Sequence, residues 1–354
     1  MSGLRIGAGS AWWGDRIEPA KLNAEQGDLD YLCFETMAEA TVSAAQVRKR
    51  RDPSFPGYDT YLDDRMKAVL PGCLERGTRI ISNQGWINPD GAAQRIVELL
   101  REHGARGKKV AAVSGSLITD RIAKLGGTIL ENGAPVSSIA SEIISAEAYL
   151  GAEPIAEALR QGADIVITGR VADPSLFLAP MMHEFGWRAD DFAKLGAGSG
   201  LGHLLECGAQ VTGGYFADPG FKDVPNPWDL AFPIAEVESD GSAVIAKVAG
   251  TGGAINAMTV KEQMLYEVHD PANYITPDVV VDFTTAALEQ AGPDRMRVRN
   301  IGGKPRTATL KVSMGCMEGF IGEDMFFYAG PGALRRAQLA KTILEERFRI
   351  VDLK

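Results

Sequence analysis

Two ionisable side chains stand at helical spacing in the middle of the chain, with glycines on both sides. His203 and Glu206 are three residues apart, and side chains at positions i and i+3 are neighbours on one helix face. If residues 200–207 form a helix, the pair can carry out acid/base chemistry, because the unperturbed pKa of histidine lies near neutrality. A hydrogen bond at a helix end is the other interpretation of this spacing, and it stays open.

The residues after this pair combine a flexible backbone with polar side chains. Glycine lets the backbone approach a ligand closely. A second glycine-rich loop at 250–253 precedes a predicted helix at 260–266, and backbone amides before a helix can bind an anion. We expect these loops to stabilise an enolate, although turns alone would also explain their glycines. The expected substrate contacts here are Gln210, Gly213, Gly214, Gly252 and Gly253.

The first half of the chain alternates short apolar runs with amphipathic segments. This alternation predicts an α/β fold with an open, mainly parallel sheet and helices on both faces. The predicted strands are 4–7, 29–34, 79–82, 109–113 and 163–168, and the predicted helices are 38–50, 91–103, 118–124 and 153–161.

Polar and flexible residues follow most of these strands. Ligands of open parallel sheets bind outside the carboxyl ends of the strands. Each residue alone is equally typical of a helix N-cap or a turn, but their number at one edge predicts a ligand crevice. Among them, Arg170 is expected to bind a substrate carboxylate bidentately. The expected catalytic residues here are Glu35 and Asp173, and the expected substrate contacts are Gly7, Gly9, Ser10, Asp15, Asn83, Gly169 and Arg170.

Past residue 215 the pattern changes to mixed α+β. Asp240-Gly241 between the runs 232–238 and 242–247 predicts a hairpin. We therefore divide the chain into a parallel-sheet domain, 1–215, and a mixed portion, 216–354. Further strands are predicted near 279–283, 296–298, 307–312 and 319–328, and a closing helix at 333–348.

The glycines at 7, 9 and 14 resemble a dinucleotide-binding motif without matching it. The motif requires a third glycine three residues after the second, and Trp12 occupies that position. We therefore do not expect NAD, although an NAD(P)-dependent oxidoreductase is kept as an alternative. No Walker A sequence supports ATP hydrolysis.

Composition excludes several classes of function. The chain has 37 basic and 46 acidic residues, a formal net charge of −9, which argues against nucleic acid or an anionic membrane as a partner. No apolar run approaches the length of a membrane span. The four cysteines are scattered, without the spacing of a zinc site or a disulfide framework, which is typical of a reducing cytoplasm.

Five segments in order give the chain a family resemblance. They are GAGSAWWGD at 7–15, TGRVAD at 168–173, GHLLECGAQVTGGYF at 202–216, GTGG at 250–253 and YAGPG at 328–332. Together they resemble the acyclic terpene utilisation AtuA family over nearly the whole chain. The resemblance implies catabolism of citronellol- and geraniol-type acids and related branched carboxylic acids. It also implies that family members continue past the last helix, often with a ferredoxin-like domain or a separate ferredoxin-like partner chain, so this chain is expected to end early relative to the family.

These observations lead to a functional hypothesis and its alternatives. We expect an enzyme of small or branched carboxylic acid or acyl-CoA catabolism, a hydratase or lyase with His203 and Glu206 as its acid/base pair. A metal-dependent version uses His203, Glu206 and one Asp as ligands; oxygen-rich ligation suits Mg²⁺ or Mn²⁺ better than zinc, but no recognised ligand spacing is present. The rival hypothesis is a non-catalytic acyl-binding subunit that works with a small partner protein. We also expect a homo-oligomer.

Overall fold

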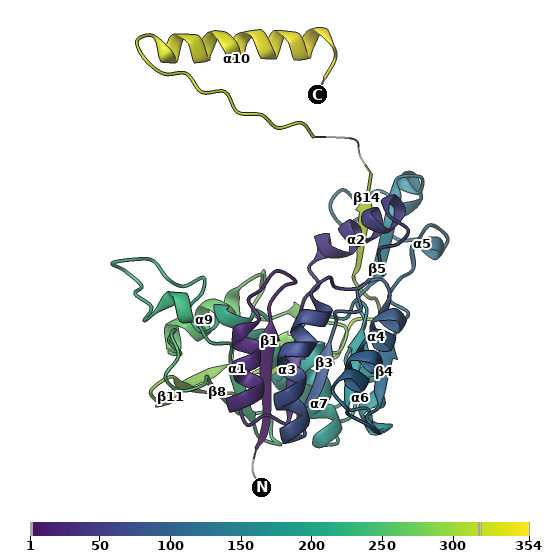
Figure 1. Ribbon diagram of the computed structural model, residues 1–354, viewed down its shortest axis with the longest axis vertical. Helices are drawn as coiled ribbons and strands as arrows, with labels where there is room; N and C mark the ends of the chain where they lie inside the picture. Colours follow the sequence, from purple (N-terminus) through teal and green to yellow (C-terminus); the bar gives the residue numbers. More distant parts are fainter. Residues whose placement is uncertain (1–2, 318, 320, 354) are drawn as a thin grey trace. The chain divides into compact units, whose positions relative to one another are not determined.

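The computed structural model describes residues 3–317, 319 and 321–353 (Figure 1). The chain forms two compact units, Met1–Cys316 and Met317–Lys354. The architectural division predicted between residues 215 and 216 lies inside the first unit and stays a prediction. The α/β fold class with a mainly parallel sheet is confirmed by the first unit, as the strand pairing shows.

Five parallel strands form one side of a nine-stranded sheet in the first unit. Four of them are mostly buried, whereas β4 is only partly buried, and their order is β1-β2-β3-β6-β4. All five were predicted from their apolar runs. Their bounds are Leu4–Ser10 for β1, Tyr31–Phe34 for β2, Arg79–Ser82 for β3, Val110–Val113 for β4 and Ile165–Thr168 for β6.

Four antiparallel strands complete this sheet beyond β1. The predicted hairpin is present, because β7 pairs with β8 and the backbone turns at Asp240-Gly241. β7 also pairs with β1, so this part of the chain joins the same sheet, whose remaining order is β11-β12-β8-β7-β1. The bounds are Ile234–Val237 for β7, Ala243–Ala246 for β8, Ala287–Gly292 for β11 and Arg295–Arg299 for β12.

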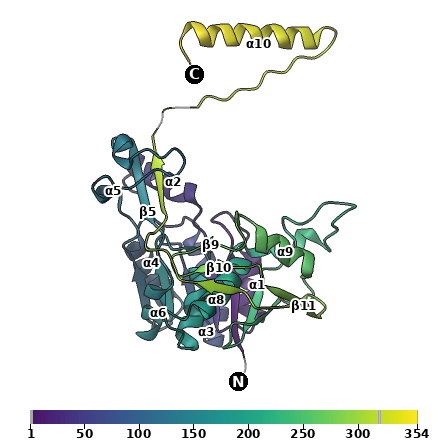
Figure 2. The same cartoon turned by 180° about the vertical axis from the view of Figure 1, so that it is seen from behind.

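Helices cover both faces of the parallel strands, as Figures 1 and 2 show from opposite sides. Side chains of successive strand residues point to opposite faces. Leu32 and Phe34 therefore pack with α1, α3 and α4, and Tyr31 and Cys33 pack with α6, α7 and α8. The bounds are Glu18–Gln26 for α1, Leu62–Arg76 for α3, Pro89–Glu102 for α4, Glu153–Arg160 for α6, Ser175–Glu184 for α7 and Phe192–Glu206 for α8.

A two-stranded antiparallel sheet carries its own small core. β5 (Ile143–Ala148) pairs with β14 (Val312–Cys316), and Glu147 lies opposite Ser313. Ala146, Ala148, Ile118 and Ile122 are buried there. The helices α2 (Glu39–Arg51) and α5 (Thr119–Leu125) contact this pair, and a short 3₁₀ helix spans Val136–Ile139.

A three-stranded sheet and a helix enclose α8 from its other side. The strands are β9 (Tyr274–Ile275), β10 (Val280–Asp282) and β13 (Gly302–Lys304), and the helix is α9 (Ala257–Leu265). α8 is almost entirely buried, because glycine removes its side chains at the contacts. A Cβ atom at Gly196 would lie 2.2 Å from the Gly302 carbonyl oxygen, and one at Gly202 would lie 2.6 Å from that of Pro174. Two further 3₁₀ helices are Gly208–Gln210 and Pro227–Asp229.

Two predicted strands were wrong. The strand expected at 307–312 begins only at Val312, because residues 305–311 form an irregular segment. The strand expected at 319–328 is absent from 321–328, and residue 320 lies outside the described residues. Both predictions rested on residue types typical of strands, which do not form a strand without a neighbour to pair with.

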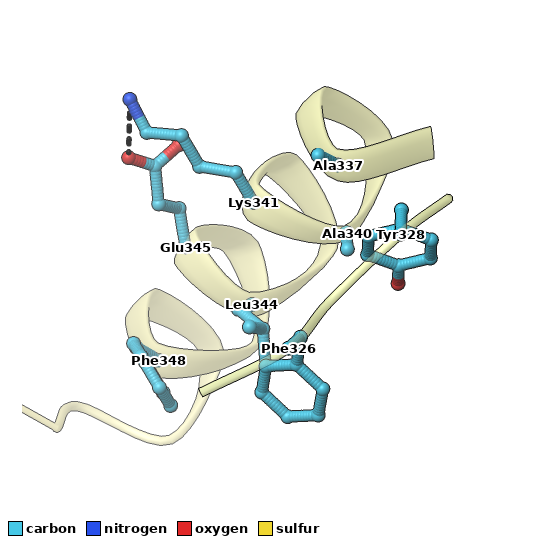
Figure 3. A pocket seen from close by; sticks show the side chains of 8 residues that line it. All are labelled: Phe326, Tyr328, Ala337, Ala340, Lys341, Leu344, Glu345 and Phe348. Atoms are coloured by element: carbon cyan, nitrogen blue, oxygen red, sulfur yellow. Dashed lines mark ion pairs between the residues drawn. The ribbon is translucent and has the colours of Figure 1, made fainter. Parts of the chain in front are cut away.

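The second unit contains one long helix, α10 (Ala333–Ile350), close to the predicted 333–348. An open groove of about 330 Å³ runs between this helix and the segment before it. Figure 3 shows Phe326 and Tyr328 against the face of Ala340 and Leu344, with Lys341 paired to Glu345 on the rim. Across the described part of the chain, no helix combines the length and apolar character needed to cross a membrane.

Candidate functional site

A cavity of about 170 Å³ in the first unit gathers four of the predicted residues. Arg170 and Asp173 reach it from the segment after β6, and His203 and Glu206 reach it from the last turn of α8. The carboxyl end of the sheet and the end of α8 therefore meet at one place, as the position of ligands in open parallel sheets predicts. The volume is below that of pockets for drug-sized ligands, roughly 300–1,000 Å³, and suits a small acyl group.

His203 is 2% exposed, and its ring contacts two aromatic rings. The ring centroids lie 5.1 Å from Tyr274 and 5.8 Å from Phe283. Its Nδ1 lies 3.5 Å from Oε1 of Glu206, which is within reach of an ion pair. Among the described residues, neither ring nitrogen has a hydrogen-bond partner. A buried polar atom without a hydrogen-bond partner destabilises the protein, so we expect the ring nitrogens to form hydrogen bonds with a ligand or a water molecule.

Arg170 lies at the centre of the buried charges. Its guanidinium stacks on the Tyr149 ring, with Cζ 4.1 Å from the ring centroid. It donates to the Met37 carbonyl oxygen, contacts Asp173 at 3.0 Å, and lies 3.9 Å from Glu35. These contacts use only part of the guanidinium, because its Nε has no partner among the described residues, so Arg170 both holds the cluster together and lines the cavity. Its predicted role as a carboxylate clamp stays a prediction.

The carboxyl groups around Arg170 hold their protons more tightly than usual. Burial raises the pKa of Asp173 to about 7, although Arg170 opposes the rise and Glu206 adds to it. The Asp173 side chain is 31% exposed, so solvent screens part of these effects. Burial, with the nearby Asp173, also raises the pKa of Glu35 well above its usual range. Near neutral pH the cavity therefore has a carboxyl group that can give up a proton.

Glu35 lies behind Arg170 and is fixed by predicted residues. Its Oε1 accepts hydrogen bonds from the backbone N–H of Met37 at 2.6 Å and from Nδ2 of Asn83 at 3.0 Å. Ser10 donates its hydroxyl to the Glu35 carbonyl oxygen at 2.5 Å. Glu35, Asn83 and Ser10 thus form a buried layer beneath the cavity lining rather than part of it.

The other predicted residues lie away from the cavity lining. Cβ atoms added at Gly7 and Gly9 would overlap Leu29 and Phe34, so these glycines allow close packing. Asp15 accepts hydrogen bonds from the Ala11 and Trp12 amides and closes its own loop. At Gly169 an added Cβ would lie 2.8 Å from Oγ of Ser116. Roles for these residues in substrate binding stay predictions.

The glycine-rich loops use their amides within the protein. The N–H groups of Gly213 and Gly214 donate to the carbonyl oxygens of Gln210 and Ala209, and those of Gly252 and Gly253 donate to Asp229 and Pro225. Gln210 is buried, and its side-chain amide has no partner among the described residues. These four amides are therefore not free to bind a substrate oxyanion in this structure.

Several residues that line the cavity were not predicted from the sequence. Tyr149 and Lys311 come from the ends of the β5–β14 pair, Tyr274 comes from β9, and Glu39 begins α2. Although burial alone would raise the pKa of Glu39, hydrogen bonds from Tyr149 at 2.5 Å and Lys311 at 3.0 Å lower it to about 2. Only Glu39 could have been predicted from the sequence, because it follows the predicted strand 29–34 by a few residues and so lies near the carboxyl end of that strand.

Metal binding and thiol chemistry also depend on side chains in this region. In residues 3–317, 319 and 321–353, no three His, Cys, Asp or Glu side chains form a group that could hold a metal ion. The predicted ligand set of His203, Glu206 and an Asp stays a prediction. Cys207 donates to Oε1 of Glu206 at 3.2 Å, and burial together with that carboxylate raises the pKa of its thiol, which keeps it protonated.

Comparison with known proteins gives one match. The family model described as acyclic terpene utilisation family protein AtuA matches residues 4–354, nearly the whole chain. Neither the curated proteins nor the solved structures contain a match to the chain.

Proposed function

This chain belongs to the acyclic terpene utilisation AtuA family, and on that premise we propose that it is a hydratase or lyase acting on a small or branched carboxylic acid or its CoA thioester. The family assignment indicates a role in acyclic terpene utilisation; the reaction is our proposal. One observation carries it. A buried histidine whose ring nitrogens have no hydrogen-bond partner among the described residues shares a small cavity with a carboxyl group whose pKa is about 7.

The positions of these groups suit the removal of water from a hydroxyacyl group. Glu206 faces Nδ1 of His203 and orients the ring, which leaves Nε2 to take a proton from the α-carbon. The electron pair of that C–H bond first forms an enolate and then moves to form the new double bond between the α- and β-carbons. The bond from the β-carbon to the hydroxyl group breaks, and Asp173 gives its proton to the departing oxygen, so that water leaves. The same steps in reverse describe hydration.

Replacement of His203 tests the proposal directly. The purified protein is assayed for dehydration and hydration with branched hydroxy acids and their CoA thioesters. His203→Ala should lower turnover by about 10²- to 10⁴-fold, the usual contribution of a general acid/base. His269→Ala is the matched control, because His269 is exposed and does not line the cavity. Full activity of His203→Ala with a normal fold would refute the mechanism.

A second candidate function is favoured by the second unit. Large apolar side chains are exposed there, including Leu339, Ile343 and Phe327 at 61%, 53% and 84%. Apolar surface of this kind is typical of a protein–protein contact. The candidate is the acyl-binding subunit that acts with a further chain, either a second copy or the small ferredoxin-like partner predicted above.

Mass measurement in solution tests whether copies of the chain associate. Light scattering should give a multiple of the chain mass if copies associate, and Leu339→Glu with Ile343→Glu should return it to a monomer. The control is Lys341→Glu, which changes charge on the groove rim and leaves both apolar side chains. A monomer at all concentrations would exclude self-association, and wild-type turnover by the isolated chain would exclude a purely binding role.

A further inference from the structure

The cavity has few donors that are free to bind a developing negative charge on oxygen. The loop amides are occupied, as described above. Tyr149 and Lys311 donate to Glu39, Thr276 donates to the Val279 carbonyl oxygen, and Thr307 donates to that of Thr309. Thr309 itself lies on the exposed rim. Among the donors that line the cavity, few remain for a substrate.

The Tyr274 hydroxyl is one that remains. Tyr274 lines the cavity, and no described residue accepts a hydrogen bond from its hydroxyl. Its ring is held on two sides, with centroids 5.1 Å from His203 and 5.8 Å from Phe283. The hydroxyl is thus carried on a ring in contact with the proposed base, which places donor and base against the same small volume.

The charges around Tyr274 keep this group a donor. Burial raises the pKa of Tyr274 well above its usual value, and the nearby carboxyl groups of Glu206 and Asp173 raise it further. A phenol with a raised pKa keeps its proton at neutral pH. It can therefore donate a hydrogen bond to an oxyanion without becoming an anion itself, and donors aimed at developing charge are among the largest contributions to catalysis.

From these observations we propose that Tyr274 is a catalytic residue that donates its O–H to the oxyanion of an enolate formed in the cavity. The proposal rests on the proposed function. When Nε2 of His203 takes the α-proton, the C–H electron pair becomes the carbon–carbon double bond of the enolate, and the negative charge moves to the carbonyl oxygen. Tyr274 hydrogen-bonds to that oxygen and keeps its own proton. The substrate class is then one with an acyl carbonyl next to an acidic C–H bond.

Tyr274→Phe removes the hydroxyl and keeps the ring that packs on His203. We expect kcat to fall by about 10²- to 10³-fold, as for the loss of one oxyanion donor, with KM changed less than threefold and thermal unfolding unchanged. Tyr58→Phe is the control, because Tyr58 lies outside the cavity lining. A kcat within twofold of wild type would overturn the role of Tyr274 and leave the proposed function standing.

A binding measurement tests the same residue without turnover. The nitronate of nitroisopentane carries its negative charge on oxygen, as an enolate does, whereas isovalerate is an ordinary branched carboxylate. Calorimetry should show nitronate binding at least tenfold weaker in Tyr274→Phe than in wild type, with isovalerate binding equal in the two. Nitronate binding that is absent from wild type, or equal in both proteins, would overturn the proposal whether or not an activity is found. Failure of wild type to turn over any acid or thioester, with Tyr274-dependent nitronate binding, would instead reject only the hydratase or lyase assignment.

Discussion

The carbonyl oxygen of Pro174 lies 2.6 Å from the place that a Cβ atom at Gly202 would occupy. Pro174 precedes α7 and lines the cavity, and Gly202 precedes His203 on α8. The absence of a side chain at 202 therefore sets how closely the helix that carries the base approaches the segment that carries Asp173.

Gly202→Ala should destabilise the protein although alanine is the better helix former. The change in helix propensity favours alanine by roughly 1 kcal/mol, but overpacking costs about 1–3 kcal/mol, and a backbone oxygen cannot move aside as a side chain can. Urea unfolding should show a lower midpoint. Gly322→Ala is the control, because no described residue has an atom within 4 Å of a Cβ at that position, its chain neighbours aside. An unchanged midpoint for Gly202→Ala would show that α8 can shift.

Asp173→Asn should change how activity depends on pH. The pKa of Asp173 is raised to about 7, so its proton is present below that pH and is lost above it. If Asp173 is the acid, the kcat of wild type should fall as pH rises through about 7. The asparagine variant should be slow at all pH values and lack this fall. A wild-type profile that is flat between pH 6 and about 8.5 would assign the acid to another group.

Glu147→Gln should change the stability of the protein more favourably at alkaline pH than at acidic pH. Glu147 is fully buried, and burial raises the pKa of its carboxyl group to about 7, although Ser116 and Arg170 oppose the rise. Because the pKa of Glu147 is raised in the folded state, its carboxyl group contributes stability below the unfolded pKa of about 4.3. That stability is lost as pH rises to about 7. The difference in unfolding free energy between variant and wild type should therefore increase by on the order of 3 kcal/mol from pH 4 to pH 8.

Denaturant unfolding at several pH values gives this difference, and Glu131→Gln provides the control because Glu131 is exposed. Equal differences at pH 4 and pH 8 would mean that the pKa of Glu147 is not raised in the folded protein. The same sign applies to Glu35, whose pKa is also raised.

Asn83→Ala should lower activity because it loosens Glu35, which lies behind Arg170, and not because Asn83 contacts a substrate. Asn83 donates to Glu35 and accepts from the Thr36 N–H at 2.7 Å, all in buried surroundings. Loss of a buried partner costs about 1–3 kcal/mol, so thermal unfolding should occur at lower temperature. Because Asn83 does not line the cavity, KM should change little; a large rise in KM with a normal melting temperature would instead favour direct substrate contact.

The parallel strands and the ends of the helices around them could be predicted, because they depend on local apolar runs and on rules of sheet topology. His203, Glu206, Arg170 and Asp173 were found for the same reason, since each lies at the end of a predictable element. Tyr149 and Lys311 could not be found, because they meet through pairing of β5 with β14, which are far apart in sequence. Tyr274 lies on a strand of two residues, too short to show a pattern.

The glycines of α8 also have a consequence for how such a protein can change over evolutionary time. At Gly196 and Gly202 any side chain would meet backbone rather than a side chain that could mutate in compensation, so these positions offer little room for substitution. The irregular segment 305–311 is largely exposed and lines the cavity through Thr307, Thr309, Leu310 and Lys311. New substrate preferences would therefore arise by variation at this rim, while the helix that carries His203 and Glu206 stays as it is.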